Sequence, residues 1–296
     1  MRYRKKNFLK ILLLFLLFAN FLAWLAVYDL SWHRPLEVVF FDIGQGDSIF
    51  IETPWKHQIL IDGGPSSKVL EKLAKEMPFW DRTIDLVILT HPEKDHVSGL
   101  IEVLKSYKVE NILWTGVVTD SFQYKEWLKR LELEGAEIKI AKAGQKIRAG
   151  KVLLDILHPL ENLENQKIKN LNNTSIVIRL SFFQNSFLFT GDIFQSREKK
   201  IIEQGIPLNS DVLKVGHHGS KTSTAEEFLK AVTPEIAVIS VGENHYGHPH
   251  QEVLDRLAEA GAKLLRTDRE GDIKIISNGS KLKIKMQNDK PKCKKN

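Results

Sequence analysis

The segment Thr90-His91-Pro92-Glu93-Lys94-Asp95-His96 decides the fold, because it places four metal-capable side chains within six residues. It follows Asp85 to Thr90, an apolar run typical of a buried strand. In a regular helix residues i and i+4 share a face while i+2 points away, so these four side chains converge only from a loop. Pro92 disfavours helical geometry at His91, and we expect a helix to begin near Asp95. This position, beyond the carboxyl end of a strand, is where α/β proteins usually bind ligands.

The rest of the chain alternates short apolar or β-branched runs with segments of helical spacing. Strands are expected at 36–41, 48–52, 58–61, 85–90, 111–114, 137–141, 152–157, 175–180, 186–190, 236–240, 264–265 and 273–276. Helices are expected at 68–76, 97–107, 122–134, 197–204, 224–232 and 251–260. Strand meanders followed by strand–helix alternation predict an α/β domain of two sheets with helices outside, in two similar halves, rather than a doubly wound parallel sheet.

The N-terminus predicts a membrane segment. Ile11 to Tyr28 contains one strongly polar residue, Asn20, and as a helix would span about 27 Å, close to the thickness of a bilayer core. Five positive charges precede it, which favours a cytoplasmic N-terminus and a single-pass protein whose domain lies outside the cell membrane. A cleaved signal peptide, which would leave a secreted protein, is the alternative. We therefore divide the chain into a cytoplasmic basic flank (1–10), a transmembrane anchor (11–30), a folded domain (36–285) and a basic tail (286–296).

The net charge of +6 comes from the two ends of the chain. Residues 1–10 carry +5 and residues 281–296 carry +6, so the remaining 270 residues sum to −5. A polyanion-binding domain usually has a basic surface, and here only a local groove is expected, from Lys199, Lys200, Lys214 and Lys221. The single cysteine, Cys293, excludes a thiolate metal cluster. Imidazole and carboxylate groups must therefore hold any metal ion.

Four motifs resemble those of the metallo-β-lactamase superfamily, in the same order. The segment from His91 to His96 resembles its H-x-(H/E/D)-x-D-H signature. The other three are Ile61-Asp62-Gly63-Gly64, Phe189-Thr190-Gly191-Asp192 and Tyr246-Gly247-His248-Pro249. The resemblance implies the αββα sandwich of that superfamily.

A closer resemblance is to the C-terminal hydrolase-like domain of ComEC, the DNA-uptake channel. It rests on Phe41-Asp42-Ile43-Gly44-Gln45-Gly46-Asp47-Ser48, on Asn172-Asn173-Thr174-Ser175 and on Leu213-Lys214-Val215-Gly216-His217-His218-Gly219-Ser220. The motifs together cover about residues 36 to 280, and the multi-spanning channel region of ComEC has no counterpart here. The resemblance therefore implies the hydrolase domain on an anchor of its own.

The resemblance also implies a ligand set. His91, Glu93 and Asp192 would serve one metal ion, and Asp95, His96, Asp192 and His248 a second, with Asp62 orienting the cluster. Glu93 stands where many members have histidine. The middle-histidine motif has no match, so either His217 or His218 fills this position, with His218 favoured, or one metal site is weak or empty. His245 and His250 flank His248 and are alternatives to it.

Four further residues are candidates for the pocket: Asp47, Asn173, Ser175 and His217. From the residues alone, the glycine-rich segment around Asp47 reads as a turn. Its place in the ComEC-like motif makes Asp47 a candidate pocket residue.

The donor set suits one or two zinc or manganese ions, and the additional carboxylate of Glu93 tilts it towards manganese. Such ions lower the pKa of bound water towards about 7 and so generate hydroxide at neutral pH. Asp95 is the expected catalytic residue, which orients the nucleophile or accepts its proton.

The expected function is metal-dependent hydrolysis of a phosphodiester, with single-stranded DNA as the substrate that the ComEC resemblance implies. A small ester, a lactone or an envelope phosphodiester is the second hydrolase interpretation. A degenerate domain that binds nucleic acid or a partner without catalysis is the third, supported by the missing middle histidine.

Overall fold

Two mixed β-sheets pack face to face in the unit formed by Pro35–Asn296. The computed structural model describes residues 2–31 and 34–287. The strands are β1 (Leu36–Phe40), β2 (Ile49–Glu52), β3 (Gln58–Ile61), β4 (Thr83–Ile88), β5 (Lys108–Trp114), β6 (Glu137–Ile140), β7 (Lys146–Ala149), β8 (Val152–His158), β9 (Val177–Phe182), β10 (Asn185–Phe189), β11 (Val212–Lys214), β12 (Ile236–Ile239), β13 (Lys263–Arg266), β14 (Asp272–Ser277) and β15 (Leu282–Gln287).

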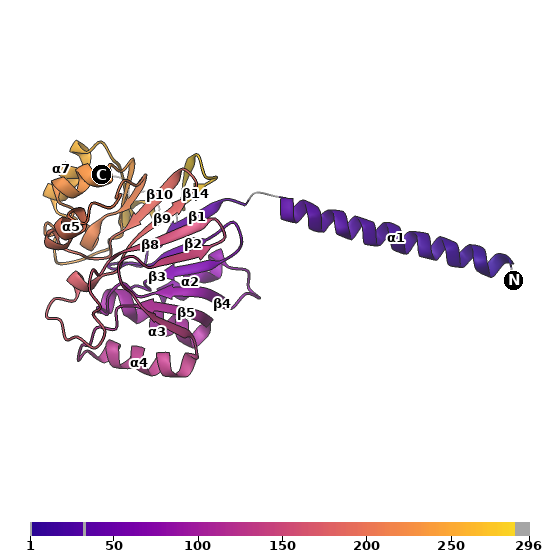
Figure 1. Ribbon diagram of the computed structural model, residues 1–296, viewed down its shortest axis with the longest axis horizontal. Coiled ribbons are helices and arrows are strands. Elements are labelled where there is room, and N and C mark those ends of the chain that lie inside the picture. Colours follow the sequence, from indigo (N-terminus) through magenta and orange to yellow (C-terminus); the bar gives the residue numbers. More distant parts are fainter. Residues whose placement is uncertain (1, 32–33, 288–296) are drawn as a thin grey trace, which may run out of the picture. The chain divides into compact units, whose positions relative to one another are not determined.

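Helices cover the outer faces of both sheets (Figure 1). They are α2 (Lys68–Glu76), α3 (Lys94–Ser106), α4 (Phe122–Glu134), α5 (Gln195–Ile202), α6 (Glu226–Val232), α7 (Gln251–Glu259) and the short α8 (Thr267–Glu270), with 3-10 turns η1 (Asn172–Thr174) and η2 (Gly216–Gly219). The helices α2, α3 and α4 pack on the first sheet, and α5, α6 and α7 pack on the second. The four layers confirm the αββα fold expected from the sequence.

The two sheets have similar topologies. The first has the order β15-β14-β1-β2-β3-β4-β5-β6 and the second β13-β12-β11-β10-β9-β8-β7. In each, one part is a run of parallel strands (β3 to β6, and β10 to β13) and the other is antiparallel. This repetition is the two-halved architecture that the strand and helix pattern predicts.

Alternation along the strands builds the core. In β1, Val38 and Phe40 face the second sheet, whereas Val39 faces the helices on the other side. Residues two apart share a face of a strand, so a strand buried on both faces needs apolar residues throughout. That requirement explains why the central strands read as continuous apolar runs.

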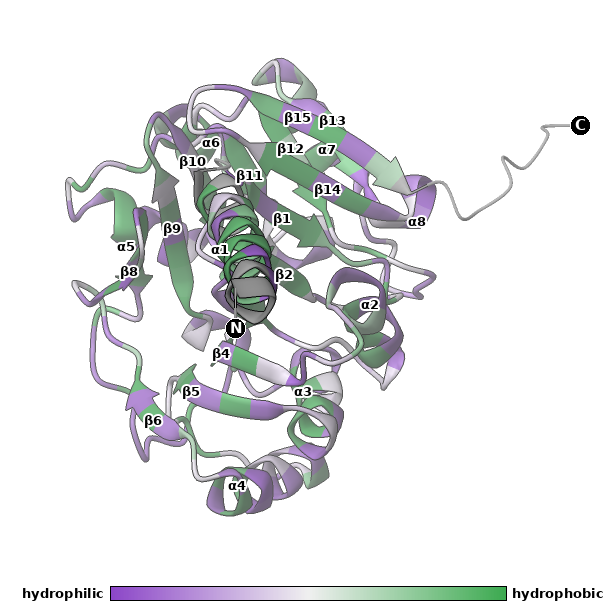
Figure 2. Ribbon diagram, turned by 90° about the vertical axis from the view of Figure 1, so that its right-hand side faces the viewer, coloured by the Kyte–Doolittle hydropathy of each residue, from purple (hydrophilic) through white to green (hydrophobic). Residues whose placement is uncertain are grey.

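The N-terminal unit contains α1 (Arg2–Ser31). Within it Asn7–Leu25 is long and apolar enough to cross a membrane, by length and composition. Figure 2 colours most of this helix as hydrophobic. At the other end, β15 runs to Gln287, two residues past the predicted domain boundary. Of the predicted basic tail, residues 288–296 lie outside the described residues.

Parallel strands bring the predicted motifs to one edge of the sandwich. Thr90 follows β4, Asp62 follows β3, and Asp192 and His218 follow β10 and β11. Since β3 and β4 are parallel, as are β10 and β11, their carboxyl ends meet at the same end of each sheet. The helix α3 begins at Lys94, one residue from the expected start, and Glu93 before it is extended.

A close backbone approach fixes α3 against the turn after β3. The Gly63 N–H donates to the His96 carbonyl oxygen over 2.8 Å, and the Gly99 N–H donates to that of Gly64 over 2.9 Å. A Cβ atom on Gly99 would lie 1.8 Å from the Gly63 oxygen. The first turns of α3 thus pack directly against the turn at Asp62, because Gly63 and Gly99 carry no side chain.

We expect Gly99→Ala to lower the free energy of unfolding by about 1–3 kcal/mol, because the added methyl group overpacks this contact. Urea unfolding of the fragment 35–296 measures the change. Lys105→Ala, on the exposed side of the same helix, is the matched control and should shift stability by no more than about 0.5 kcal/mol. Equal midpoints for the two variants would contradict the close-packing explanation.

Candidate metal centre

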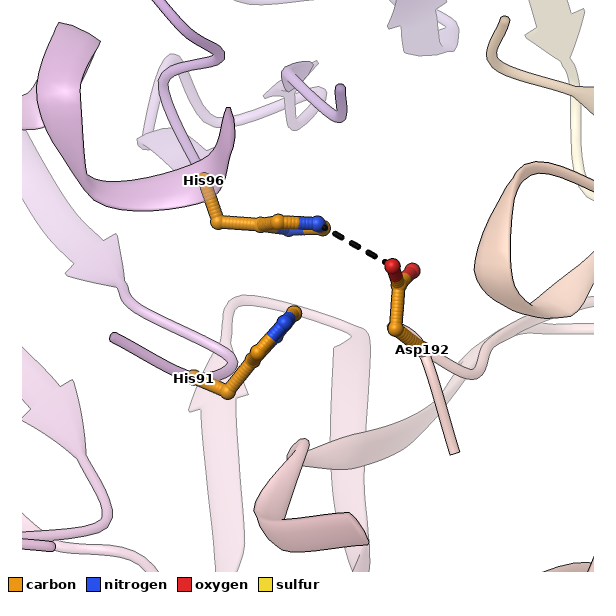
Figure 3. Close-up of side chains that lie close together, drawn as sticks. All are labelled: His91, His96 and Asp192. Atoms are coloured by element: carbon orange, nitrogen blue, oxygen red, sulfur yellow. Dashed lines mark ion pairs between the residues drawn. The ribbon is translucent and has the colours of Figure 1, made fainter. Parts of the chain in front are cut away.

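His91, His96 and Asp192 meet inside the domain, from the loop after β4, the start of α3 and the loop after β10. Figure 3 shows both imidazole rings directed towards the Asp192 carboxylate. The ring centroids of His91 and His96 are 4.1 Å apart, and His96 Nε2 lies 3.3 Å from Asp192 Oδ2. All three side chains are buried. One ligand atom from each lies within 4.8 Å of the others, which is close enough to share one ion.

His218 completes the cluster. Its Nε2 atom lies 3.2 Å from Asp192 Oδ2 and 3.4 Å from Asp95 Oδ2. His217 and His218 both have left-handed backbone angles in η2, with φ of 48° and 53°. His218 is buried in the cluster, whereas His217 lines the adjoining pocket. The sequence motif left open which of these two histidines serves the site. His218 is the one that lies beside Asp95 and Asp192, and we propose it as the ligand.

Hydrogen bonds fix the tautomer of His91. The Ser175 hydroxyl donates to the Asn172 carbonyl over 2.7 Å, and the Thr90 hydroxyl donates to Asp62 over 2.6 Å. Both hydroxyl oxygens also lie near His91 Nδ1, at 3.2 and 3.1 Å. Because both hydroxyl protons are already donated to other oxygens, the two hydroxyl oxygens can only accept a hydrogen bond from His91. His91 therefore carries its proton on Nδ1. Its Nε2 atom is left with a lone pair.

The other two rings are oriented in the same way. His96 Nδ1 lies 2.8 Å from the Asp62 carboxylate, and His218 Nδ1 lies 2.9 Å from the Ser240 carbonyl, and both oxygens accept. The Nε2 atoms of all three histidines are buried without a well-directed hydrogen-bond partner among the described residues. Metal-binding histidines are held in this way, with one nitrogen anchored and the other free for the ion. These side chains therefore fit a divalent metal ion.

The electrostatics of the cluster also fit a cation. Burial lowers the pKa of His91 to about 3, which keeps this ring neutral. Burial lowers the pKa of His96 and His218 too, but Asp192 and the other neighbouring carboxylates outweigh it, and the pKa of each ring lies well above its ordinary value. Because a metal ion binds only the deprotonated Nε2 atom, ion binding at these two rings competes with protonation.

Lys214 is the unexpected member of the site. Its ammonium group pairs with Asp47 and lies 3.3 Å from Asp192 Oδ1, with the side chain 1% exposed. Burial lowers the pKa of this ammonium, but the Asp47 and Asp192 carboxylates raise it above the ordinary lysine value. The expectation that Lys214 contributes to a surface groove for DNA is wrong, since this lysine is an internal counter-ion.

Asp47 belongs to the cluster, as the ComEC-like motif suggested. Its Oδ1 atom lies 3.5 Å from His218 Nδ1, and the side chain is buried. The preceding residue, Gly46, has φ of 139°, and a Cβ atom there would lie 2.3 Å from the Asp95 carbonyl oxygen. The glycine allows this loop to lie against the start of α3, which places the Asp47 side chain in the interior.

Glu93 and His248 do not join the cluster, among the residues that the structure describes. Glu93 is the residue before α3, and its pKa is raised by burial and by Asp95. His248 is half-buried, and burial together with His217 lowers its pKa to about 4. Of the ligand set implied by the resemblance, the structure thus brings His218 beside Asp95 and Asp192 and leaves Glu93 and His248 in the wall of the adjoining pocket.

A pocket of about 420 Å³ opens beside the cluster. Its lining residues are Gln45, Pro65, Glu93, Lys94, Asp95, Asp192, His217, Glu243, Asn244, His245, Tyr246 and His248. Asp95 and Asp192 thus belong both to the cluster and to the pocket wall. A substrate in this pocket would lie directly against the ligand side chains.

Three neighbouring rings, those of Tyr246, His248 and His217, line the pocket, and Phe194 lies behind His217 outside the lining. The ring centroids of Tyr246 and His248 are 5.6 Å apart, those of His248 and His217 are 5.3 Å apart, and those of His217 and Phe194 are 5.5 Å apart. The Phe194 N–H donates to Asn173 Oδ1 over 3.3 Å. Asn173 therefore supports the backbone of this wall and does not reach the cluster.

A family model described as the metallo-beta-lactamase superfamily matches residues 41–243. The chain is 32% identical over 255 residues to ComE operon protein 3 of Bacillus subtilis, covering 80% of this chain and 32% of that protein. It is 31% identical over 243 residues to competence protein ComA of Neisseria gonorrhoeae, with coverage of 80% and 32%. The chain thus spans about a third of the length of these relatives, and the resemblance found in the sequence is confirmed.

A solved structure supports the fold. The metallo-beta-lactamase fold protein YhfI from Bacillus subtilis superposes with a TM-score of 0.56, covering 81% of this chain and 99% of that one. The sequences are 14% identical, so this similarity concerns the fold alone.

We expect Lys214→Met to destabilise the metal-free fragment 35–296 by about 3–5 kcal/mol, because it leaves Asp47 and Asp192 buried without their cation. Guanidinium unfolding measures the loss. Lys221→Met, an exposed lysine seven residues on, is the control and should stay within about 0.5 kcal/mol of the parent. If the two variants unfold together, Lys214 is not the internal counter-ion.

Loss of a residue that only hydrogen-bonds to a metal ligand weakens metal binding by roughly 10–100-fold. His218→Ala should weaken the binding of Mn²⁺ or Zn²⁺ by more than this, because it removes a ligand. His248→Ala should weaken it by less than about tenfold. Titration calorimetry on the same fragment gives both affinities. The reverse order would restore His248 as the ligand and refute the placement of His218.

Proposed function

The chain belongs to the metallo-β-lactamase superfamily and is a metal-dependent hydrolase, and we propose that it cleaves phosphodiester bonds of single-stranded DNA. The observation that carries this proposal is the set of rings of Tyr246, His248 and His217, which line the same pocket as Asp95. Aromatic side chains along a groove stack successive bases without regard to sequence. The similarity to ComE operon protein 3 and to competence protein ComA is consistent with a DNA-related role.

His91, His96, His218 and Asp192 would hold the metal ion, with Asp95 beside them. Imidazole and carboxylate donors without thiolate suit zinc or manganese, and we propose one or two such ions as the cofactor. When bound, a divalent ion supplies a Lewis acid and lowers the pKa of water towards about 7.

Asp95 is the proposed catalytic base. Its carboxylate lines the pocket and lies 3.4 Å from His218 Nε2. Burial raises the pKa of Asp95, but the adjacent His218 ring and the charge of His96 outweigh this and hold it below the ordinary value. An ionised carboxylate at the pocket wall can orient a water molecule and accept its proton.

The neighbouring groups position this base and the ligands. Asp62 holds His96 and the Thr90 backbone, and Ser175 accepts the Asp192 N–H over 3.0 Å. Lys94, at the pocket rim, offers a positive charge for a phosphate oxygen. The pocket therefore combines a base, an anion contact and a stacking wall.

We further propose that α1 anchors the protein as a single-pass membrane protein with the hydrolase domain outside the cytoplasm. The apolar span Asn7–Leu25 has the required length, and the charges of the first ten residues favour a cytoplasmic N-terminus. The same features are compatible with a signal sequence that is removed.

The test is hydrolysis by the fragment 35–296 loaded with Mn²⁺ or Zn²⁺, assayed on single-stranded DNA and on a simple phosphodiester. We expect turnover of both, and a loss of roughly 10²–10⁴-fold in Asp95→Ala, because the variant removes a proton acceptor. Lys169→Ala, an exposed residue outside the pocket lining, is the control and should retain full activity.

Other results would assign another function. Turnover of carboxylic esters but of neither phosphodiester would favour a small-ester substrate. Tight, salt-sensitive DNA binding without cleavage would indicate a binding domain. Full phosphodiesterase activity in Asp95→Ala would remove Asp95 from the proposed role.

A further inference from the structure

Exposed aromatic side chains gather at the end of the sandwich opposite the metal centre. Phe79 is 81% exposed, Trp80 73%, Phe183 64% and Trp55 43%. Large apolar side chains grouped on a surface mark an interaction site more often than single exposed ones do. The turns and the loop that carry these four residues are called the basal end below.

Contacts between the turns place Trp55 and Phe183 together. The Trp55 ring, in the β2–β3 turn, lies 6.5 Å from Phe182, the residue before Phe183 in the β9–β10 turn. The Gln184 N–H in that turn donates to the Gly279 carbonyl of the β14–β15 turn over 2.8 Å. Three hairpin turns therefore form one continuous surface.

Phe79 and Trp80 extend this surface from the loop before β4. Their ring centroids are 4.8 Å apart in an edge-to-face arrangement. The loop is held by Asp81, whose carboxylate accepts a hydrogen bond of 2.8 Å from Gln58, the first residue of β3. Since β3 starts where the β2–β3 turn ends, this loop lies at the same end of the first sheet.

The chain reaches the folded domain at this same end. β1 begins at Leu36, paired with Ser277 beside the β14–β15 turn, and Glu37 pairs with Glu52 at the end of β2. From Ser31, the last residue of α1, to Leu36 an extended chain spans at most about 17 Å. If residues 7–25 cross a bilayer, this short connection keeps the basal end within reach of the lipid head groups.

The composition of the basal end fits a lipid surface. Tryptophan and phenylalanine favour the boundary between hydrocarbon and water. Lysines accompany them: Lys151 Nζ lies 5.3 Å from the centroid of the Phe183 ring, and Lys56 and Lys281 are exposed on neighbouring turns. Their ammonium groups suit anionic head groups.

We propose that the basal end is a membrane-docking surface, on which Trp55, Phe79, Trp80 and Phe183 insert their rings among the lipid head groups. The proposal rests on the proposed anchor. Because the anchor would hold the basal end at a high effective concentration near the bilayer, a weak contact between the basal end and the lipid is sufficient.

Docking in this way sets the direction of the active site. β4 and β10 start at the basal end and finish at the loops that carry His91 and Asp192. Strands of five or six residues separate the two ends by roughly 16–20 Å. The pocket then faces away from the bilayer, where a polymeric substrate in water can reach it.

The test uses the full-length protein in vesicles of phosphatidylethanolamine and phosphatidylglycerol, with a single environment-sensitive fluorophore. The labels are placed by Phe79→Cys or Phe183→Cys in a Cys293→Ser background. Phe122→Cys is the matched control, because Phe122 is 72% exposed at the start of α4, on the site side of β5. Lipid-borne nitroxides should quench the labels at 79 and 183 at least threefold more than the label at 122. Equal quenching at all three positions would overturn the proposal.

A second measurement separates docking from the anchor. The fragment 35–296 contains both sheets and all three cores as one compact unit. It should float with the same vesicles, and Phe79→Ser with Trp80→Ser should reduce the bound fraction at least threefold, while Phe122→Ser leaves it unchanged. Hydrolysis of a soluble phosphodiester should stay the same in all variants.

Failure of the anchor and failure of the docking surface give different results. Release of the full-length protein by alkaline carbonate would remove the anchor, yet vesicle binding by the fragment would still support the docking surface. A fragment that binds no vesicles, or that dimerises through the basal end instead, would assign these aromatic residues to a protein contact and refute the lipid proposal.

Discussion

The buried Asp192 carboxylate belongs to two overlapping groups of potential metal ligands, one with His91 and His96 and one with His218 and Asp47, and much of the domain serves to hold these side chains together. His91, His96 and His218 each anchor Nδ1 on a neighbouring oxygen, which leaves Nε2 directed at Asp192. Such groups are costly to bury without a partner. Three features bring these side chains from two separate sheets into contact. They are the parallel strands, the glycine contact under α3 and the loop that ends at Asp47.

Charge balance explains how the acidic groups of the cluster are accommodated in the interior. The carboxylates of Asp47, Asp62 and Asp192 are all buried. Lys214 pairs with Asp47 and Asp192, and His96 Nδ1 lies 2.8 Å from Asp62. Burial lowers the pKa of His96 and His218, but Asp192 and the other neighbouring carboxylates outweigh this and raise it well above the ordinary histidine value. These neighbours offset the cost of burying three carboxylates close to one another.

The sequence predicted the fold and most of the site, because its motifs follow apolar strands and the signals are local. His91, Asp95, His96 and Asp192 are brought together as expected. His218 and His248 were harder to separate, since both follow strands and only the strand order places one of them beside Asp192. Lys214 was misassigned to the surface. A lysine in the apolar run Val212 to Val215 was the available signal, but its two carboxylate partners lie far away in sequence.

X-ray absorption spectroscopy of the Mn²⁺- or Zn²⁺-loaded protein tests the central claim most directly. The proposed ligand set of His91, His96, His218 and Asp192 predicts a first shell that contains imidazole nitrogen, with the multiple-scattering signature of about three rings, together with carboxylate oxygen. Removing one ring by His218→Ala should lower that signature by one. A first shell of oxygen atoms alone, or a spectrum unchanged in His218→Ala, would contradict the placement of a metal ion among these three histidines.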